Sequence, residues 1–472
     1  MKTIAEFRPF IKSLLLGAVA CLLATGCKTY NQQNKVINYW QRGDLTSAAA
    51  EATKAAAKNA NNKNAVLWRL EQGATLRANG QYEDSNQAFD AAQQKMDDYA
   101  RQAKVRLGQE TGALLSNQAQ LDYEGRAYDG IMLNTYRALN YLALGEPDRA
   151  RPELIRAYQR QQDAVQDNQK RLEQVQKEAA QNKDSATIQK AQNDPGLQNQ
   201  IQNSFATRNH LEPYAAYVNP FTVYLDGLYF MTDAADSSDL ERARKSFERV
   251  TEMAPDNPYV RKDVAMVDGL INGRPLPATV FVIFETGCAP IRGQIRIDIP
   301  IIISKVSYIG AAFPTLQPQD NFLPNLTVSA DGKSWNTALV SDMDSVIGLD
   351  FKNEMPIVIT KTIAAAVVKG VAAYAANQAV GQQNDLAGLF MQIGTAVYQA
   401  AVNIADDRTW TTLPKQFQVC HFPMPPDRTI ELITPDQRRI IPVTIGYGSL
   451  ILVYVKSINA DSPLLVTQMK LR

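Results

Sequence analysis

A recurring pattern of small and large residues around a turn glycine is the feature that most constrains the fold. In its clearest instance, Tyr141 precedes Gly145, and Ala150, Leu154 and Ala157 follow at fixed intervals. Small residues let two helices approach closely, large residues fill the space between helix pairs, and glycine permits the positive φ of a helix end. The pattern therefore predicts stacked pairs of helices. Three further matches are Tyr39, Gly43, Ala48 and Ala55; Leu76, Gly80, Tyr82, Ser85, Phe89 and Ala92; and Leu240, Ala243, Phe247, Val250 and Pro255.

This spacing resembles that of tetratricopeptide repeats, so we expect residues 34–272 to form a tetratricopeptide-like α-solenoid. In such a solenoid the first helix of each pair usually lines a concave groove, and that groove binds a protein or peptide. The candidate groove residues are Asn134, Arg137, Asn140 and Arg149.

A polar insertion interrupts the repeats at residues 159–205, with apolar residues at heptad-like intervals and a break at residues 193–196. We predict a protruding helical hairpin there. One interpretation is an arm that grips a partner. The favoured interpretation is a solvated helix extension with a thin apolar seam.

The sequence changes character after residue 272, and residues 273–472 are predicted to form a β-rich domain. Isoleucine alternates with charged residues from Ile295 to Ile299, as in a strand with one buried and one wet face. An alanine-rich insertion at residues 356–405 predicts two helices. Membrane insertion is one reading of this pair, but no run reaches about 18 apolar residues, so we expect it to pack on the protein. The predicted fold class is α+β, with an antiparallel β-sandwich-like domain. The expected strands are 279–284, 293–304, 306–311, 326–329, 346–351, 416–421, 429–433, 440–443, 449–455 and 464–469.

The first 26 residues have the pattern of a lipoprotein signal peptide. Basic residues come first, and the apolar run Leu14–Ala24 is too short to span a bilayer, which needs about 20 residues. The run ends in small residues before Cys27, which resembles the lipobox of bacterial lipoproteins; the alternative is an ordinary secretory signal with an incidental cysteine. We predict removal of residues 1–26, lipidation of Cys27 and a lipidated linker over residues 27–33. Because Lys28 follows the cysteine where aspartate would favour the inner membrane, we expect the periplasmic face of the outer membrane.

Charge and cysteine content narrow the classes of partner. Without residues 1–26 the chain keeps 46 basic and 47 acidic side chains, which argues against binding to nucleic acid. Its two histidines are too few for a histidine-rich metal site.

Cys288 and Cys420 remain in the β-rich region, either as a disulfide in an oxidising compartment or as two separate buried thiols. Spacing alone does not decide between these alternatives.

No catalytic motif is present. The sequence lacks G-x-S-x-G, a phosphate-binding loop, H-E-x-x-H and C-x-x-C. The densest polar cluster is Asp406, Asp407 and Arg408, followed by Trp410. A general acid and base is one interpretation of this cluster; the favoured one is a structural junction between helix and strand, with Trp410 packed beneath. We therefore predict no enzymatic activity, no cofactor and no metal.

Three stretches resemble a family of tetratricopeptide-containing lipoproteins of Gram-negative bacteria. They are Tyr123–Ala157, Gly287–Ile299 and Ala405–Pro414, and the resemblance extends over most of the mature chain. It implies no activity or ligand. Similar proteins are linked with small lipoproteins that include activators of peptidoglycan synthases, which implies a role in the envelope or cell wall.

The sequence thus suggests a non-enzymatic scaffold, anchored to the membrane by its lipid and binding a periplasmic protein or peptide. Two alternatives remain open. One is a structural subunit of an outer-membrane export or surface-appendage assembly. The other is an envelope enzyme, such as a cell-wall hydrolase, with its site in the β-rich domain. The sequence does not indicate an oligomeric state.

Overall fold

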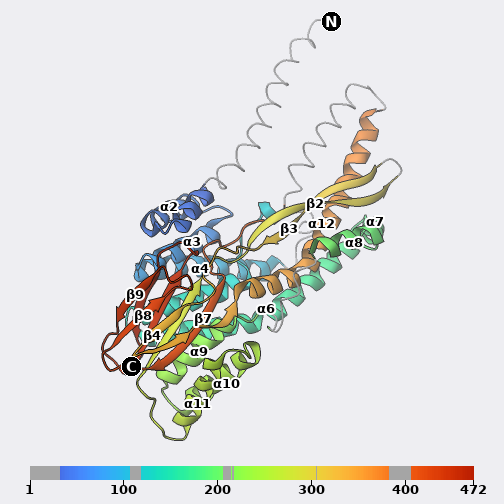
Figure 1. The fold of residues 1–472 in the computed structure, drawn as a ribbon. Coiled ribbons are helices and arrows are strands. Elements are labelled where there is room, and N and C mark those ends of the chain that lie inside the picture. The colour runs from blue at the N-terminus through green and yellow to red at the C-terminus, as the bar shows by residue number, and fades with distance from the viewer. Residues whose placement is uncertain (1–31, 107–117, 206–213, 215–216, 304–305, 382–404) are drawn as a thin grey trace.

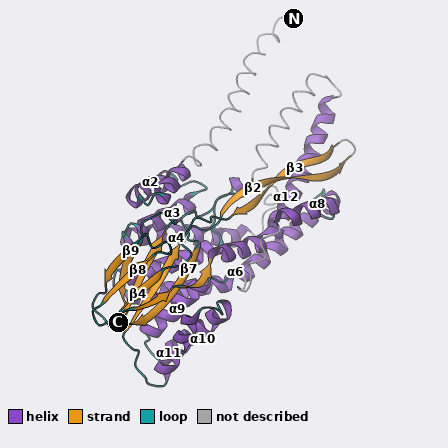
Figure 2. Ribbon diagram, viewed as in Figure 1, coloured by secondary structure: helices purple, strands orange, loops and turns teal. Residues whose placement is uncertain are grey.

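The computed structural model describes residues 32–106, 118–205, 214, 217–303, 306–381 and 405–472. The predicted signal peptide, the lipidation residue Cys27 and nearly all of the second helix expected at residues 385–405 lie outside these ranges. Helices come first and strands follow, with one long helix between two groups of strands (Figures 1 and 2). The helices are α2 (Leu45–Lys58), α3 (Ala65–Ala78), α4 (Tyr82–Arg106), a short 3₁₀ helix (Gln118–Gln120), α5 (Ala127–Ala143), α6 (Pro147–Gln181), α7 (Ser185–Gln192), α8 (Pro195–Phe205), α9 (Pro220–Thr232), α10 (Ser237–Met253), α11 (Pro258–Ile271) and α12 (Met343–Gly381).

Turn glycines separate the helices of the first three pairs, as the sequence pattern predicts. Gly43 lies between a helix over residues 32–41 and α2, Gly80 between α3 and α4, and Gly145 between α5 and α6; all three have φ between +73° and +78°. A side chain at such a φ would be strained, so glycine fits these turns. The small residues after each turn are fully buried, which allows close helix packing: Ala48, Ala55, Ser85, Ala92, Ala150 and Ala157.

The largest sheet has five strands in the order β11-β10-β1-β7-β6. Strand β1 pairs in parallel with β10 and antiparallel with β7, so the sheet is mixed rather than purely antiparallel. All eight residues of β1 and all eight of β10 are buried, as expected for central strands covered on both faces. The strands of this sheet are β1 (Thr279–Thr286), β6 (Ala338–Asp342), β7 (Gln416–Pro423), β10 (Leu450–Ser457) and β11 (Leu465–Lys470).

The five-stranded sheet lies between two other layers. On one face it packs against helices, where the rings of Phe221 in α9 and Phe417 in β7 stack 3.7 Å apart. On the other face it packs against a four-stranded sheet, where Trp335 stacks on Phe422 at 4.4 Å. The four-stranded sheet has the order β5-β4-β8-β9, formed by β4 (Thr327–Ala330), β5 (Lys333–Asn336), β8 (Thr429–Ile433) and β9 (Ile440–Thr444).

One hydrophobic core joins these three layers. It runs without interruption from Val66 in α3 to Met469 in β11, through helices, both sheets and Trp410. The expected boundary at residues 272–273 falls between the end of α11 and the start of β1, where helices give way to strands. The core crosses that boundary, and we call this three-layered part the main body.

A second unit projects from the main body (Figure 1). It contains the later part of α6, helices α7 and α8, helix α12, and a two-stranded ribbon of β2 (Ile291–Ile303) and β3 (Val306–Gln317). We call it the projecting unit. It has a core of its own, which is mostly aliphatic and includes Val175, Ala179, Ile188, Leu197, Ile297, Ile299, Phe313, Phe351, Ile357 and Val367.

This arrangement corrects the expectation of a solvated helix extension. The helical insertion breaks where predicted, since α7 ends at Gln192 and α8 begins at Pro195, but its apolar seam is not solvated. Val175 and Ala179 of α6 are buried with side chains of the ribbon and of α12, so the insertion is part of a packed unit. The alanine-rich segment likewise packs on the protein over its described part, as expected.

Residues 346–351, predicted as a strand, lie in helix α12. Asp342 accepts hydrogen bonds from the backbone N–H groups of Asp344 and Ser345, which starts the helix. The buried residues that follow are Val346, Ile347, Asp350 and Phe351, and this spacing is helical. Residues 343–372 are long and apolar enough to cross a membrane by length and composition, and half of the most apolar window is buried inside the protein.

Candidate functional site

Three of the four candidate groove residues are buried. Asn140 donates to Ser85 Oγ at 2.9 Å and to Asn86 Oδ1 at 3.0 Å, and its Oδ1 accepts from Arg77 Nη1 at 2.7 Å. These partners belong to the neighbouring helices α3 and α4. All polar atoms of the Asn140 side chain are therefore engaged inside the helical array, which corrects its assignment to an open groove.

Asn134 and Arg137 belong to a second interhelical network. Asn134 Nδ2 donates to Gln93 Oε1 at 2.9 Å and to Glu153 Oε2 at 2.6 Å. Arg137 lies 3.4 Å from Glu153 and also donates to Gln93. Helix α5 is thus joined to α4 and α6 by these side chains. Because both side chains are buried and make their contacts inside the helical array, they do not present a binding surface.

Arg149 is the one exposed residue of the four. It pairs with Glu146 at 2.7 Å, three residues earlier, and its guanidinium lies 4.3 Å from the centre of the Tyr141 ring. Such an exposed pair within one helix contributes little to stability. The four residues are therefore not one site.

The helix faces that were expected to line a groove are covered by the chain's own sheet. The inner faces of α5, α9 and α11 contact β1 and β7, through Tyr136 on Glu285, Phe221 on Phe417, and Tyr259 on His421. Helix α3 reaches the segment before β7, where its buried Glu71 accepts hydrogen bonds from Thr411 N and from the hydroxyls of Thr411 and Thr412. The face that would bind a partner in an open solenoid is covered.

In the polar cluster before β7, Arg408 and Asp406 are engaged in contacts inside the protein. Arg408 Nε donates to Asp406 Oδ1 at 2.7 Å, and Arg408 also donates to the carbonyl of Leu121 at 2.9 Å. Trp410 is fully buried against Phe89. Burial and the neighbouring Asp406 raise the pKa of Asp407. The cluster ties the strand-rich half to the helices.

Cys288 and Cys420 are both free thiols, which corrects the disulfide alternative. Cys288 packs with Trp40, Ala48 and Ile458, whereas Cys420 lies in the core of the main body. Burial raises the pKa of Cys288 to about 11 and raises that of Cys420 further. Neither thiol is activated as a nucleophile, because the thiolate is the reactive form.

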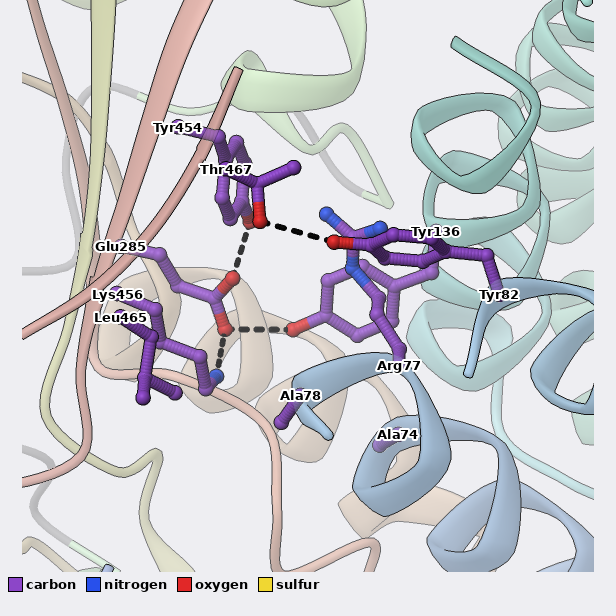
Figure 3. A pocket seen from close by; sticks show the side chains of 10 residues that line it. All are labelled: Ala74, Arg77, Ala78, Tyr82, Tyr136, Glu285, Tyr454, Lys456, Leu465 and Thr467. Atoms are coloured by element: carbon purple, nitrogen blue, oxygen red, sulfur yellow. Dashed lines mark hydrogen bonds and ion pairs between the residues drawn. The ribbon is translucent and has the colours of Figure 1, made fainter. Parts of the chain in front are cut away.

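A polar cavity lies between α3, α5 and the edge of the five-stranded sheet (Figure 3). At its base, Glu285 accepts hydrogen bonds from Tyr136, Tyr454 and Lys456. Opposite this carboxylate, the guanidinium of Arg77 lies among three tyrosine rings, 4.9 Å from the centre of Tyr454. The cavity has a volume of about 30 Å³, and its remaining lining residues are Ala74, Ala78, Tyr82, Leu465 and Thr467.

The protonation states at this cavity follow from the contacts. Burial alone would raise the pKa of Glu285, but the adjacent Lys456 and the hydroxyl of Tyr454 hold it below its usual value. Burial and the neighbouring carboxylate raise the pKa values of Tyr136 and Tyr454 well above 10. Glu285 is therefore ionised at neutral pH and its two tyrosine partners are neutral. With three donors already bound, Glu285 has little capacity to act as a general base.

A second buried charge cluster joins the main body to the projecting unit. Glu354 of α12 accepts from Arg292 Nη2 at 2.6 Å and from Arg126 Nη1 at 3.1 Å. Burial would raise the pKa of Glu354, yet the two arginines lower it to about 2. Asp350, one turn earlier, has its pKa raised to about 7 by burial and by the charge of Glu354. We call these four residues the junction cluster.

A third buried pair has no cavity beside it. His421 Nε2 lies 3.2 Å from Asp263 Oδ1, and both side chains are buried beneath α11. Burial lowers the pKa of His421 to about 4, so the imidazole is neutral near pH 7, and burial raises the pKa of Asp263 well above its usual value. Within the described residues, no group of three or more histidine, cysteine, aspartate or glutamate side chains is placed to hold a metal ion.

Sequence reasoning missed the cavity and the junction cluster. Their members are far apart in the chain, and Arg77 and Glu285 belong to different halves of it. One signal was present: Glu285 and Lys456 each follow an apolar run that forms a central strand. A charge in such a strand needs a buried partner. Neither cluster is matched to a known protein, because no family model, curated protein or solved structure matches this chain.

Proposed function

We propose that this protein is a lipid-anchored, non-enzymatic scaffold of the bacterial cell envelope, held at the periplasmic face of the outer membrane through Cys27. The lipobox-like end of the N-terminal segment supports the anchor. A family resemblance to tetratricopeptide lipoproteins supports the envelope role. The carboxylates of Glu71, Glu285 and Glu354 are each already bound by two or more donors, which favours structural roles for them over catalysis.

The helix pairs support a tetratricopeptide-like array. Turn glycines with positive φ and fully buried small residues recur at equivalent positions in three pairs. In the pair α9–α10 the equivalent residues Ala243, Phe247 and Val250 are also fully buried. Helices α3, α5 and α9 are the first members of their pairs, and their inner faces meet the sheet.

The main support for this proposal is that the sheet covers the inner faces of the helices. Since the chain's own sheet occupies the inner face, partners bind to outward surfaces of the helix pairs and of the projecting unit. Helix α6 belongs to both parts and displays the exposed apolar side chains Ile155, Tyr158 and Val165. These residues share one side of the helix, since they are spaced by three and seven positions.

Photo-crosslinking in living cells tests this proposal. A crosslinking residue is placed at Tyr158 or Val165 on α6, at Tyr447 before β10 as an exposed control, and at Asn140 as a buried control. We expect the α6 positions to capture a short, reproducible set of envelope proteins that the two controls do not capture. Capture at Tyr447 alone, or the same abundant proteins at every position, would overturn the assignment to α6.

A second candidate function is a subunit of a larger envelope assembly. The observation in its favour is the β2–β3 ribbon, whose two outer edges pair with no other strand of the described chain. Open edges can add strands from other copies. The mass of the soluble form, residues 28–472, measured by light scattering, separates the two functions: a monomer supports the scaffold and a ring supports the assembly.

The enzyme alternative has its own test. A peptidoglycan zymogram of the purified protein reports hydrolysis directly. We expect no clearing at any loading at which a known hydrolase is active, and clearing would overturn the scaffold proposal.

A further inference from the structure

The cavity between α3 and the sheet carries an uncompensated positive charge. Its lining includes two cationic groups, Arg77 and Lys456, and one ionised carboxylate, Glu285. Arginine stays protonated in proteins, so the lining has a net charge of +1. Arg77 is only 8% exposed. Burying an unpaired charge is costly, which favours an anion in this place.

The contacts show why Glu285 does not neutralise both cations. Lys456 donates directly to Glu285, and the two tyrosine hydroxyls take up the rest of its accepting capacity. The hydrogen bond of Arg77 at 2.7 Å goes to the neutral amide oxygen of Asn140. The guanidinium therefore has no hydrogen bond to a carboxylate of the described residues, and its other near neighbours are the rings of Tyr82, Tyr136 and Tyr454, with a further hydrogen bond to the Tyr454 side chain.

The remaining lining suits a small organic anion. The hydroxyls of Tyr82 and Thr467 form a hydrogen bond of 2.8 Å with each other at the other side of the cavity, which leaves one of their two protons to donate to a carboxylate oxygen. Ala74, Ala78 and Leu465 form an apolar part of the wall (Figure 3). A volume of about 30 Å³ exceeds the 10–15 Å³ or so that one water needs, so the cavity has room for more than one water-sized group.

We propose that the cavity lined by Arg77, Lys456, Tyr82 and Thr467 binds a small monocarboxylate of the size of formate or acetate. The carboxylate lies beside the guanidinium of Arg77 and neutralises the excess charge. Its apolar end faces the alanines of α3 and Leu465. This site is independent of the outward surfaces assigned to protein partners, so either assignment can fail without the other.

Charge variants test the proposal because they change the excess positive charge of the cavity lining in opposite directions. Lys456→Met reduces the lining charge to zero, and Glu285→Gln raises it to +2. In the purified soluble form, we expect acetate at constant ionic strength to raise the Tm of the parent in a saturable way. The dissociation constant should rise at least tenfold in Lys456→Met and fall in Glu285→Gln. Saturation-transfer NMR on acetate measures the binding directly in whichever variants fold.

A steric pair of variants controls for general effects of salt. Leu465→Phe fills the cavity without changing its charge, and Val466→Phe places the same ring on the next residue of β11, which is not part of the lining. We expect Leu465→Phe to abolish the acetate response and Val466→Phe to retain it. No saturable response to formate or acetate in the parent, or an equal response in both phenylalanine variants, would overturn the proposal. A chloride response of the same size that survives in Leu465→Phe would also do so.

Discussion

The main body and the projecting unit are stabilised in different ways. The main body has one core in which stacked aromatic rings and buried polar networks join helices to strands that are distant in sequence. The core of the projecting unit consists mainly of isoleucine, valine and alanine around one two-stranded ribbon. A two-stranded ribbon is marginally stable unless a helix covers it. The ribbon therefore depends on α12, α7 and α8.

The difference indicates a gradient of stability along the molecule. A region opens locally with ease when opening breaks few buried contacts, and the projecting unit has few such contacts. Opening of the main body would expose the shared core of all three layers. We therefore expect the projecting unit to open while the main body stays folded, and each variant below tests that expectation.

The largest effect is expected in the main body. Phe221→Ala removes a fully buried ring stacked at 3.7 Å on Phe417, so the free energy of unfolding should fall by about 3–5 kcal/mol. Urea denaturation followed by tryptophan fluorescence measures the change. The exposed Val165→Ala is the matched control and should change stability by less than about 0.5 kcal/mol. Similar losses in both variants would contradict the assigned core.

Glu354→Ala should affect the projecting unit more than the main body. The substitution leaves the buried guanidiniums of Arg126 and Arg292 without their carboxylate, at a cost of about 3 kcal/mol. Hydrogen exchange should accelerate in β2, β3 and α12 and stay unchanged in β1 and β10. Faster exchange throughout the molecule would mean that the two parts unfold as one unit.

Substitution of a buried residue of the predicted groove should reduce stability more than substitution of an exposed one. Asn140→Ala removes the hydrogen bonds that Asn140 makes with Arg77, Ser85 and Asn86, and should cost about 1–3 kcal/mol. Arg149→Ala removes only an exposed pair and should cost less than about 1 kcal/mol. Denaturant midpoints of the two variants provide the comparison. Equal midpoints would restore the open-groove interpretation.

The smallest effect on stability is expected at the junction cluster, when the pH is changed. Asp350 has a folded pKa of about 7, above its unfolded value near 4, so its folded form binds the proton more tightly. Its contribution to stability is present below pH 4 and is lost as the pH rises to 7, by about 1 kcal/mol between pH 6 and pH 7. Hydrogen exchange of α12 at the two pH values measures this loss. Asp350→Asn, which cannot ionise, should show no such dependence.

Much of the fold could be predicted from the sequence because interactions between residues close in the chain determine it. The glycine turns and buried small residues of the helix pairs depend on contacts between neighbours in sequence. The late strands also match, and residues 429–433 form β8 at the predicted bounds. The error at residues 346–351 has a local cause, since a short apolar run does not distinguish a strand from a buried helix.

The sites were predicted poorly because their contacts are not local. Asn134 and Asn140 have the polarity of groove residues, and only the tertiary structure shows that their partners are other helices and that a sheet covers the groove. Arg77 and Glu285 meet across 208 positions of sequence, and no short-range pattern connects them. The sequence likewise left open whether Cys288 and Cys420 form a disulfide or two separate buried thiols, because that choice depends on a distance between residues far apart in the chain; in the structure both are free thiols.

The position of β10 has a consequence for how the chain reaches its native state. This strand lies between β1 and β11 inside the largest sheet, yet it comes from residues 450–457, long after the helices that pack on that sheet. During synthesis the ribosome completes α3, α5 and α9 more than two hundred residues earlier, so their apolar faces stay uncovered until β10 has been made. Folding of the main body can therefore be completed only late in synthesis, when its non-local strand pairs become available.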